Sequence, residues 1–332
     1  MKNTEPTLMQ TGTSLPAKSK TEQFYDDVIT GLQSAPKYLN SKYFYDAHGD
    51  KLFQDLMNCE EYYPTNRELE IFSEKTAEIC KAIIGDGDAF DLIELGAGDA
   101  TKSTYLLQYL MEQQADFTYL PIDISENVIS YLNVTLPVTL PGIQITGLNG
   151  EYFDMLEKAA SLSNKRKVVM FLGSNIGNMQ ADEAESFCRE LREHLSAGDM
   201  MLIGFDLKKN PKTVLAAYND KGGITKQFNL NLLGRINREL NADFDIAKFE
   251  HYPTYDPETG ACKSYLISIC DQEVQIGAEV IHFLRDEYIF MEISQKFTIA
   301  QTDKMAKNSS FKPVNYFFDS RKWFTDTIWI AG

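Results

Sequence analysis

Two glycines directly behind an acidic strand end carry the clearest chemistry in this chain. Residues 91–102 read Asp-Leu-Ile-Glu-Leu-Gly-Ala-Gly-Asp-Ala-Thr-Lys, so an apolar run ends near Glu94 and leads into Gly96 and Gly98. Glycine lacks the Cβ that blocks close approach of a ligand, and a helix starting after such a loop presents free N–H groups. We predict that a nucleotide-like ligand binds here, although an ordinary strand-to-helix turn has the same pattern.

The third glycine of the dinucleotide-binding fingerprint is absent, since Thr101 and Lys102 follow instead. This favours S-adenosylmethionine (SAM) over a nicotinamide cofactor, because SAM has no pyrophosphate to hold. Asp123 closes the next predicted strand, where a carboxylate can accept hydrogen bonds from both ribose hydroxyls of an adenosine. The alternative for Asp123 is a helix N-cap, and we favour ribose binding.

Two later loops add candidates. Glu151 and Tyr152 end the following unit, where an acid can meet an adenine amine and an aromatic ring can cover the base. An exposed loop acid is an equal alternative for Glu151. Residues 171–178 form a buried strand end followed by glycines and amides, including Gly173 and Asn178. Amides bind a carboxylate, or hold an amine lone pair, without adding charge, which suits a reaction between a neutral amine and a sulfonium. A glycine-rich turn with left-handed Asn is the alternative.

The elements that must position these residues alternate between about residues 88 and 206. We predict strands at Phe90–Leu95, Phe117–Asp123, Ile143–Thr146, Val168–Leu172 and Met200–Phe205, and helices at Thr101–Gln113, from Ser125 as N-cap, and at Asp182–Leu195. This order implies a parallel sheet with right-handed crossovers and a ligand at the carboxyl ends of its strands. Further strands are predicted at Ser264–Cys270, Glu279–Phe283, Glu292–Phe297 and Trp323–Ile330, and the last ones could close the SAM-binding sheet with a hairpin.

The fold class predicted is therefore α/β, a Rossmann-like SAM-dependent methyltransferase sheet with a second, smaller α+β substrate domain. Residues 81–207 plus 286–332 would form the SAM-binding domain, and residues 21–80 plus 208–285 the substrate or lid domain. Residues 1–20 are polar, and we expect a flexible tail there.

The composition limits the classes of molecule that this protein is expected to bind. The 332 residues carry a net charge of −16, which argues against nucleic acid and anionic membranes and for a small-molecule substrate, although acidity also serves solubility. No apolar run reaches membrane-spanning length and no signal peptide is apparent, so we expect a cytoplasmic protein. We also expect a monomer. Five scattered cysteines and four histidines lack metal-ligand spacing, so we expect neither disulfides nor a metal.

Motifs spread over the chain resemble one family, the histidine N-alpha-methyltransferases, the EgtD-like enzymes of ergothioneine biosynthesis. The matching segments keep their order and spacing from about residue 40 to 300. They are residues 44–49, 52–53, 61–65, 94–98 with Lys102, 123–125, 171–178, 217–220, 228–229, 237–240 with Phe244, and 292–297.

The resemblance implies a role for each matching position. Gly96, Gly98, Lys102, Asp123, Glu151 and Tyr152 would line the SAM site, Glu151 standing where the family often has Asp. Asn178 and Tyr218 would hold the substrate carboxylate, with Gly173 beside them. Tyr62, Glu292 and Ser294 would bind the imidazole ring, and Tyr45 would lie near the reacting amine. The implied reaction is SAM-dependent methylation of the α-amine of L-histidine, with the trimethylated betaine hercynine as the expected end product.

One departure from the family concerns the side-chain pocket, where histidine-selective members can carry Met and our alignment places Tyr265. Because of Tyr265, a second hypothesis for the function remains: a methyltransferase of the same fold that acts on another amino acid or a small amine. A SAM-binding protein without turnover and a nicotinamide oxidoreductase are further alternatives, the latter disfavoured by the missing glycine. Without the resemblance, Tyr62 would be read as a core aromatic and Glu292 as a solvent-facing acid.

Overall fold

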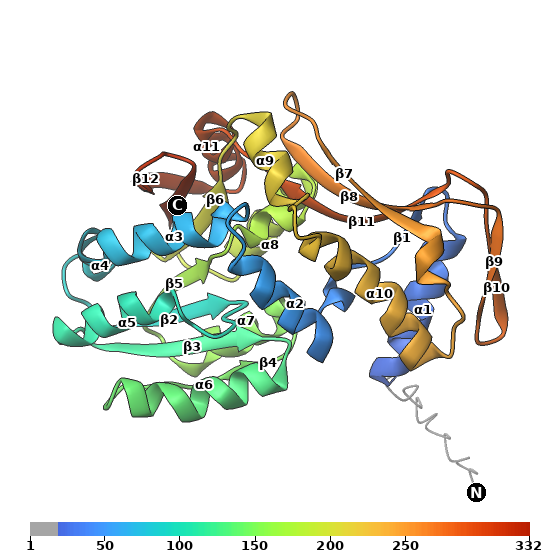
Figure 1. Ribbon diagram of the computed structural model, residues 1–332. Helices are drawn as coiled ribbons and strands as arrows, with labels where there is room; N and C mark the ends of the chain where they lie inside the picture. The colour runs from blue at the N-terminus through green and yellow to red at the C-terminus, as the bar shows by residue number, and fades with distance from the viewer. Residues whose placement is uncertain (1–18) are drawn as a thin grey trace, which may run out of the picture.

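The computed structural model describes residues 19–332 and shows two sheets side by side (Figure 1). Within this described part, seven strands form the large sheet. In spatial order they are β12 (Phe311–Phe318), β13 (Phe324–Ala331), β6 (Met200–Asp206), β5 (Arg166–Phe171), β2 (Phe90–Leu95), β3 (Phe117–Asp123) and β4 (Leu148–Asn149). The strands from β6 to β4 pair in parallel, whereas β13 is antiparallel to both its neighbours. This confirms the Rossmann-like α/β sheet, closed at one edge by a C-terminal hairpin.

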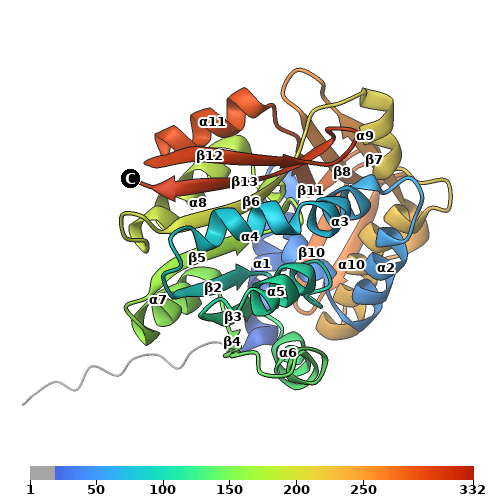
Figure 2. The ribbon, with the colours of Figure 1, turned by 90° about the vertical axis from the view of Figure 1, so that its left-hand side faces the viewer.

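Helices cover both faces of the large sheet (Figure 2). One face carries α3 (Tyr63–Glu74), α4 (Thr76–Ile84), α5 (Ser103–Glu112) and α6 (Glu126–Thr139), and the other carries α7 (Tyr152–Leu162), α8 (Ala181–Glu193) and α11 (Ile299–Asn308). The continuous apolar run of β5 is explained by burial on both faces of the sheet. Val168 and Met170 enter the core on one face, while Val169 and Phe171 enter the core on the other.

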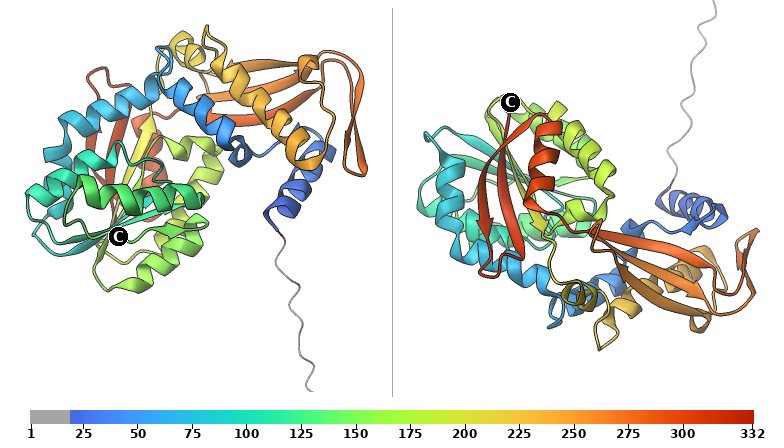
Figure 3. Two further views of the ribbon diagram at one scale, coloured as in Figure 1. Left: turned by 60° about the horizontal axis from the view of Figure 1, so that its bottom comes forward. Right: turned by 90° about the horizontal axis from the view of Figure 1, so that it is seen from above.

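The small sheet lies beyond β6 and has the order β1-β11-β8-β7 (Figures 1 and 3). Its strands are β1 (Lys37–Tyr38), β11 (Tyr288–Gln295), β8 (Ala261–Ser268) and β7 (Phe249–Tyr255), with the hairpin β9 (Gln272–Ile276) and β10 (Glu279–Phe283) beside them. The helical segments around it are α1 (Lys20–Gln33), η1 (Ser41–Phe44), α2 (Ala47–Met57), α9 (Pro211–Ala217), α10 (Ile224–Leu240) and η3 (Ile246–Lys248). A separate core of α1, α2, α10 and the small sheet holds this part together.

Several predicted elements are confirmed. The strands at Phe90–Leu95, Phe117–Asp123 and Glu279–Phe283 have the predicted ends, and Ser125 caps α6 by accepting a hydrogen bond from the Val128 N–H. The strand predicted at Ile143–Thr146 is wrong, because this segment makes only an isolated bridge between Ile145 and Tyr119. Its isoleucines instead pack from a loop onto the core of the large sheet.

The strand predicted at Glu292–Phe297 corresponds to β11, and its expected place in the hairpin that closes the large sheet is wrong, because β12 and β13 form that hairpin. β11 pairs with β8 and β1, so it belongs to the small sheet although it lies within residues 286–332. Conversely, Ile71 and Phe72 of α3 and residues of α4 belong to the core of the large sheet, although the predicted boundary assigns 21–80 to the substrate domain. Of the expected tail, residues 1–18 lie outside the described residues, and Ser19 already caps α1.

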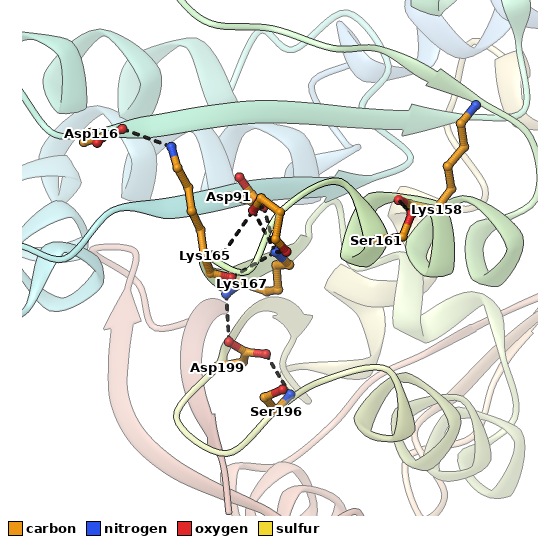
Figure 4. A network of polar contacts seen from close by, with 9 residues as sticks. Asp91, Asp116, Lys158, Ser161, Lys165, Lys167, Ser196 and Asp199 are labelled. Atoms are coloured by element: carbon orange, nitrogen blue, oxygen red, sulfur yellow. Dashed lines mark hydrogen bonds and ion pairs between the residues drawn. The ribbon is translucent and has the colours of Figure 1, made fainter.

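The amino-terminal ends of the central strands are joined by a polar network (Figure 4). Lys167, 5% exposed, donates through Nζ to Asp91 at 2.7 Å, and its backbone N–H donates to Asp199 at 2.7 Å. Nearby, Lys165 pairs with Asp116 at 3.0 Å. The network ties β2, β5 and the start of β6 together at the edge opposite the glycine loop. Between residues 19 and 332, no helix is both long and apolar enough to cross a bilayer.

Candidate active site

The carboxyl end of β2 leads directly into the glycine loop, whose Gly96 and Gly98 have φ of +71° and +54°. Asp123 at the end of β3 faces this loop. Its Oδ2 accepts a hydrogen bond from the Gly98 N–H at 3.2 Å, and its Oδ1 accepts one from the Ser125 N–H at 2.9 Å. Since Ser125 is the N-cap of α6, the capping alternative for Asp123 is wrong. Each carboxylate oxygen keeps lone pairs free for further donors such as hydroxyls.

Tyr152 forms a wall over the loop. A Cβ placed on Gly96 would lie 2.8 Å from the Tyr152 hydroxyl and 3.4 Å from Nδ2 of Asn175. Burial, followed by the charges of Asp123 and Glu151, raises the pKa of Tyr152 to about 12, so its hydroxyl is protonated at neutral pH. Glu151 itself is exposed at the start of α7. Asn175 lies close to this loop, and only its place in the run 171–178 pointed to it.

Lys102 lies at the start of α5 and forms an ion pair with Glu68 of α3, which is 1% exposed. Oε1 of Glu68 also accepts a hydrogen bond from the Gly173 N–H at 2.7 Å. Gly173 therefore lies with Lys102, on the glycine-loop side of the site. Asp326 of β13 is buried beside this group, and burial together with Glu68 raises its pKa well above the ordinary range. Sequence analysis missed Glu68, because no local pattern marks one buried acid on an amphipathic helix.

The second half of the site is built by β11, where a β-bulge separates Phe290 from Glu292. Before the bulge Phe290 lies opposite Tyr265, and after it Glu292 lies opposite Ser264. A bulge adds one residue to one strand and re-aims the side chains that follow. Glu292 and Ser294 therefore both face the side of the sheet on which Ser264 is buried.

Polar partners surround these two side chains. Oε1 of Glu292 accepts a hydrogen bond from Nδ2 of Asn229 at 3.1 Å, and Asn229 is fully buried. Burial raises the pKa of Glu292, against the hydrogen bonds of Asn229 and Ser264, which lower it. Oγ of Ser294 accepts from the Tyr218 hydroxyl at 2.6 Å. The sequence reasoning quoted Asn229 only as part of a family motif and gave it no role.

The predicted pocket position of Tyr265 is wrong in this structure. Its ring packs against Tyr288 and Phe290, with centroid distances of 5.2 and 5.9 Å, on the face of β8 opposite Ser264. Adjacent residues on a strand point to opposite faces, so an alignment error of one residue exchanges the inside for the outside. Ser264 is the β8 residue that faces Glu292.

Aromatic rings form a continuous wall beside the polar group. The ring of Tyr62 lies 6.0 Å from Tyr218 and 6.5 Å from Phe53, and Tyr45 contacts Phe53 and Phe228 at 5.6 and 5.8 Å. We call Tyr45, Phe53, Tyr62, Tyr218 and Phe228 the aromatic wall. Tyr45 is 47% exposed. Desolvation of its hydroxyl, followed by the nearby Glu292 and Tyr152, raises the pKa of Tyr45, so this hydroxyl is neutral at physiological pH.

Asn178 ends the short helical turn η2 (Asn175–Asn178) and is exposed. This turn connects the halves, because it follows Gly173 on one side and packs against β11 on the other. A Cβ on Gly177 would lie 2.8 Å from the backbone oxygen of Gln295. Glycine at this position allows the turn to approach β11 closely.

Residues 24–331 match the family described as SAM-dependent, histidine-specific methyltransferases. This chain belongs to that family. It is 35% identical over 285 residues to a histidine N-alpha-methyltransferase of Mycolicibacterium smegmatis, covering 85% of this chain and 87% of the relative. A histidine N-alpha-methyltransferase of Mycobacterium tuberculosis is 34% identical, with coverage of 82% and 83%. An L-tryptophan methyltransferase of Psilocybe serbica is 27% identical, with coverage of 89% of each chain.

Family membership confirms a SAM-dependent methyltransferase and sets aside both the nicotinamide oxidoreductase and the SAM-binding protein without turnover. The residues of this methyltransferase fit SAM. A Cβ on Gly96 would lie 2.8 Å from the Tyr152 hydroxyl, so glycine keeps the loop backbone uncovered beside this side chain, and Asp123 holds spare acceptor capacity at the expected ribose position. The predicted residues fall into a glycine-loop half and a β11 half, and their individual roles stay predictions.

Proposed function

We propose that this methyltransferase methylates the α-amine of L-histidine, through to the trimethylated betaine hercynine. The observation that carries the proposal is the common orientation of Glu292 and Ser294, set by the bulge in β11. Two residues apart on a strand, their backbones are separated by roughly 7 Å. This spacing suits an imidazole, which presents its two nitrogens in different directions. The two relatives that are at least 34% identical are both named for histidine.

In the proposed complex the glycine-loop half binds the cofactor. Asp123 accepts the ribose hydroxyls, and the Tyr152 ring lies beside the base, with Glu151 at the adenine edge. SAM, when bound, supplies a methyl group carried on a sulfonium. Lys102, already paired with Glu68, contributes a positive charge at this end. This arrangement contributes mainly proximity and orientation, which convert the methyl transfer into an effectively unimolecular in-line displacement.

The β11 half and the aromatic wall handle the substrate. Glu292 and Ser294 bind the ring, and Asn178 and Tyr218 lie toward the carboxylate. The α-ammonium proton leaves to solvent through water that is hydrogen-bonded to the neutral Tyr45 hydroxyl, which relays a proton without keeping one. Faces of the aromatic wall attract a methylated ammonium by cation–π contact, which favours retention until the third transfer. The trimethylated nitrogen has no lone pair, so the reaction ends there.

The direct test is to incubate the protein with SAM and a panel of amino acids, and to read mass shifts of one, two or three methyl groups. We expect histidine to gain three. Tryptophan is the second candidate, since the tryptophan methyltransferase relative aligns over most of the chain and the aromatic wall would accept an indole. Methylation of tryptophan in place of histidine would overturn the proposal.

Glu292→Ala tests the ring-binding role. Loss of a hydrogen bond to a charged group costs about 1.5–3 kcal/mol, so we expect histidine affinity to fall roughly 10- to 100-fold. SAM affinity should be unchanged, because the cofactor residues lie in the other half of the site. Calorimetric titration of the variant with each ligand separates the two effects. An unchanged histidine affinity would show that the imidazole is bound elsewhere.

A further inference from the structure

A fully buried lysine lies behind the ring-binding residues. Lys296 is 0% exposed and follows β11. Its Nζ donates to Oγ of Ser294 at 2.7 Å and to the Tyr218 hydroxyl at 2.8 Å, and it forms an ion pair with Oδ2 of Asp206 at 2.7 Å. An ammonium group has three N–H donors and no acceptor. All three are therefore assigned, and two of them fix hydroxyl groups of the proposed ring site.

These contacts determine which way the Ser294 hydroxyl can act. A hydroxyl has two acceptor lone pairs and one O–H donor. Oγ of Ser294 accepts one hydrogen bond from Lys296 and one from Tyr218, at 2.7 and 2.6 Å. Both lone pairs are occupied, so only its O–H remains for a ligand. Ser294 is a donor toward the ring.

Glu292 has the opposite character. Asn229 and Ser264 donate to its carboxylate, which accepts and has further lone pairs for a ring N–H. A donor on one side and an acceptor on the other match a neutral imidazole in a single tautomer. An imidazolium, with N–H on both nitrogens, would lose the bond to Ser294 and bring its charge toward Lys296.

We propose that Lys296 is a positioning residue that makes Ser294 an obligate donor, so the enzyme binds the neutral ring of histidine as the tautomer whose N–H faces Glu292. This inference rests on the proposed function. Substitution of Lys296 should spare the fold, because Asp206 keeps its ion pair with Lys209 and a 2.8 Å hydrogen bond from Tyr63.

Other charged and titratable groups also face Lys296 and Ser294. They come from every element packed around this point: Tyr62 and Tyr63 at the start of α3, Asp206 and Lys209 after β6, Tyr218 after α9, Tyr255 of β7, Cys262 of β8 and Glu292 of β11. A pH profile of a single substrate would include their titration and that of the α-amine. The experiment must therefore compare two substrates, so that the titration of the enzyme groups and of the α-amine cancels in the ratio.

The test compares histidine with 1,2,4-triazolylalanine, whose ring stays neutral between pH 5.5 and 8. Both carry the same α-amine, so the ratio of their kcat/KM values isolates ring protonation. With an imidazole pKa near 6.5, we expect the ratio for the wild type to fall roughly tenfold from pH 8 to pH 5.5. A ratio that does not fall would show that the imidazolium binds equally well and would overturn the inference.

Lys296→Met tests the lysine itself. Without the ammonium, Ser294 regains a lone pair, so the ratio should fall less than about threefold over the same range. Lys167→Met is the matched control, since Lys167 is also buried and paired, with Asp91, but lies at the opposite edge of the large sheet. We expect this control to lose stability and to keep the tenfold fall. A tenfold fall in Lys296→Met would overturn the role of Lys296.

A spectroscopic measurement covers the case in which Lys296→Met is inactive. Histidine labelled with ¹⁵N in the ring, bound to the wild type with S-adenosylhomocysteine at pH 5.5, should show one protonated and one unprotonated nitrogen. Lys296→Met, which leaves one lone pair of Ser294 free, should bind the ring with both nitrogens protonated more readily even where it is inactive, whereas Lys296→Gln, which keeps a donor to Ser294, should retain the neutral ring. Two protonated nitrogens in the wild type would overturn the inference, whereas absence of methylation of either substrate would overturn the proposed function itself.

Discussion

Asp123 accepts hydrogen bonds from two backbone N–H groups, which leaves about half of the acceptor sites of its carboxylate unused. A side chain needed only to shape the loop would be satisfied by these bonds. It lies at the carboxyl end of β3, beside Gly98, where open α/β sheets bind their ligands, so the proposed role of its remaining lone pairs is to accept from the ribose hydroxyls. The same residue was predicted for ribose from its spacing alone, and the capping alternative is gone because Ser125 takes that role.

Asp123→Ala should weaken SAM binding by roughly 10- to 100-fold, because two hydrogen bonds to a charged acceptor are lost. Histidine binding should change little. Asp116→Ala is a suitable control, since Asp116 is the exposed acid just before the other end of the same strand. Calorimetry with SAM gives the affinities, and equal SAM affinity in the two variants would remove Asp123 from the ribose site.

Individual side chains also show where prediction from sequence stops. Spacing along one βα unit was enough for Gly96, Gly98 and Asp123, since these residues are brought together by adjacent parallel strands. It was not enough for Glu68, whose contact with Lys102 spans 34 residues and has no local pattern. Tyr265 failed for a different reason, because a shift of one residue reverses the face of a strand.

At the scale of elements, β11 is the segment whose role depends most on tertiary context. Its alternation indicated a strand, and Tyr288–Gln295 is one, but its partners β8 and β1 lie far away in sequence. Neither that pairing nor the bulge before Glu292 has a sequence signature. Yet the bulge decides that Glu292 faces inward, so the residue that reads as a solvent-facing acid becomes the centre of the proposed ring site.

The glycine loop between β2 and α5 offers a sharper test at this scale. Gly96→Ala should lower SAM affinity at least about tenfold, because its Cβ would lie 2.8 Å from the Tyr152 hydroxyl and would displace that side chain at the cofactor site. The left-handed φ of +71° adds a stability cost of about 1–2 kcal/mol for an alanine. Gly223→Ala separates the two causes, since Gly223 has a φ of +70° and nothing within 4 Å of an added Cβ.

Both variants should lose similar stability from the backbone conformation, and only Gly96→Ala should lose cofactor. Thermal unfolding and SAM titration of the two proteins measure these quantities side by side. Equal SAM affinity in Gly96→Ala and Gly223→Ala would mean that the space above Gly96 is not used by the cofactor.

For the whole molecule, the site exists because two separately packed units meet. The large sheet has its own cores on both faces, and the small sheet packs with α1, α2 and α10 into another. A small group that includes Tyr63, Tyr218 and Cys262 lies between them, next to the proposed ring site. The α/β class followed from alternating elements, whereas the exact division did not, because α3, α4 and β11 pack across the predicted boundaries.

Stability of the whole molecule should depend on pH through Glu94, which is 3% exposed under the glycine loop. Burial raises its pKa to about 7 from an ordinary value of 4.5, against hydrogen bonds from Ser103 and Tyr119 that lower it. A pKa raised by folding means that the folded state binds the proton more tightly. The stabilisation is therefore complete below about pH 4.5 and is lost as pH rises through about 7.

Glu94→Gln removes this titration while keeping the shape of the side chain. Relative to the wild type, the variant should gain free energy of unfolding between pH 5 and pH 8, by roughly 3 kcal/mol at most. Urea unfolding at several pH values measures the difference, and Glu112→Gln, an exposed acid on α5, supplies the baseline for removing one carboxylate. Because other titrating groups are common to all three proteins, they cancel in the comparison. A difference between Glu94→Gln and wild type that stays constant with pH would show that Glu94 keeps its charge in the folded protein, and Lys102 nearby would then be the charge that holds it.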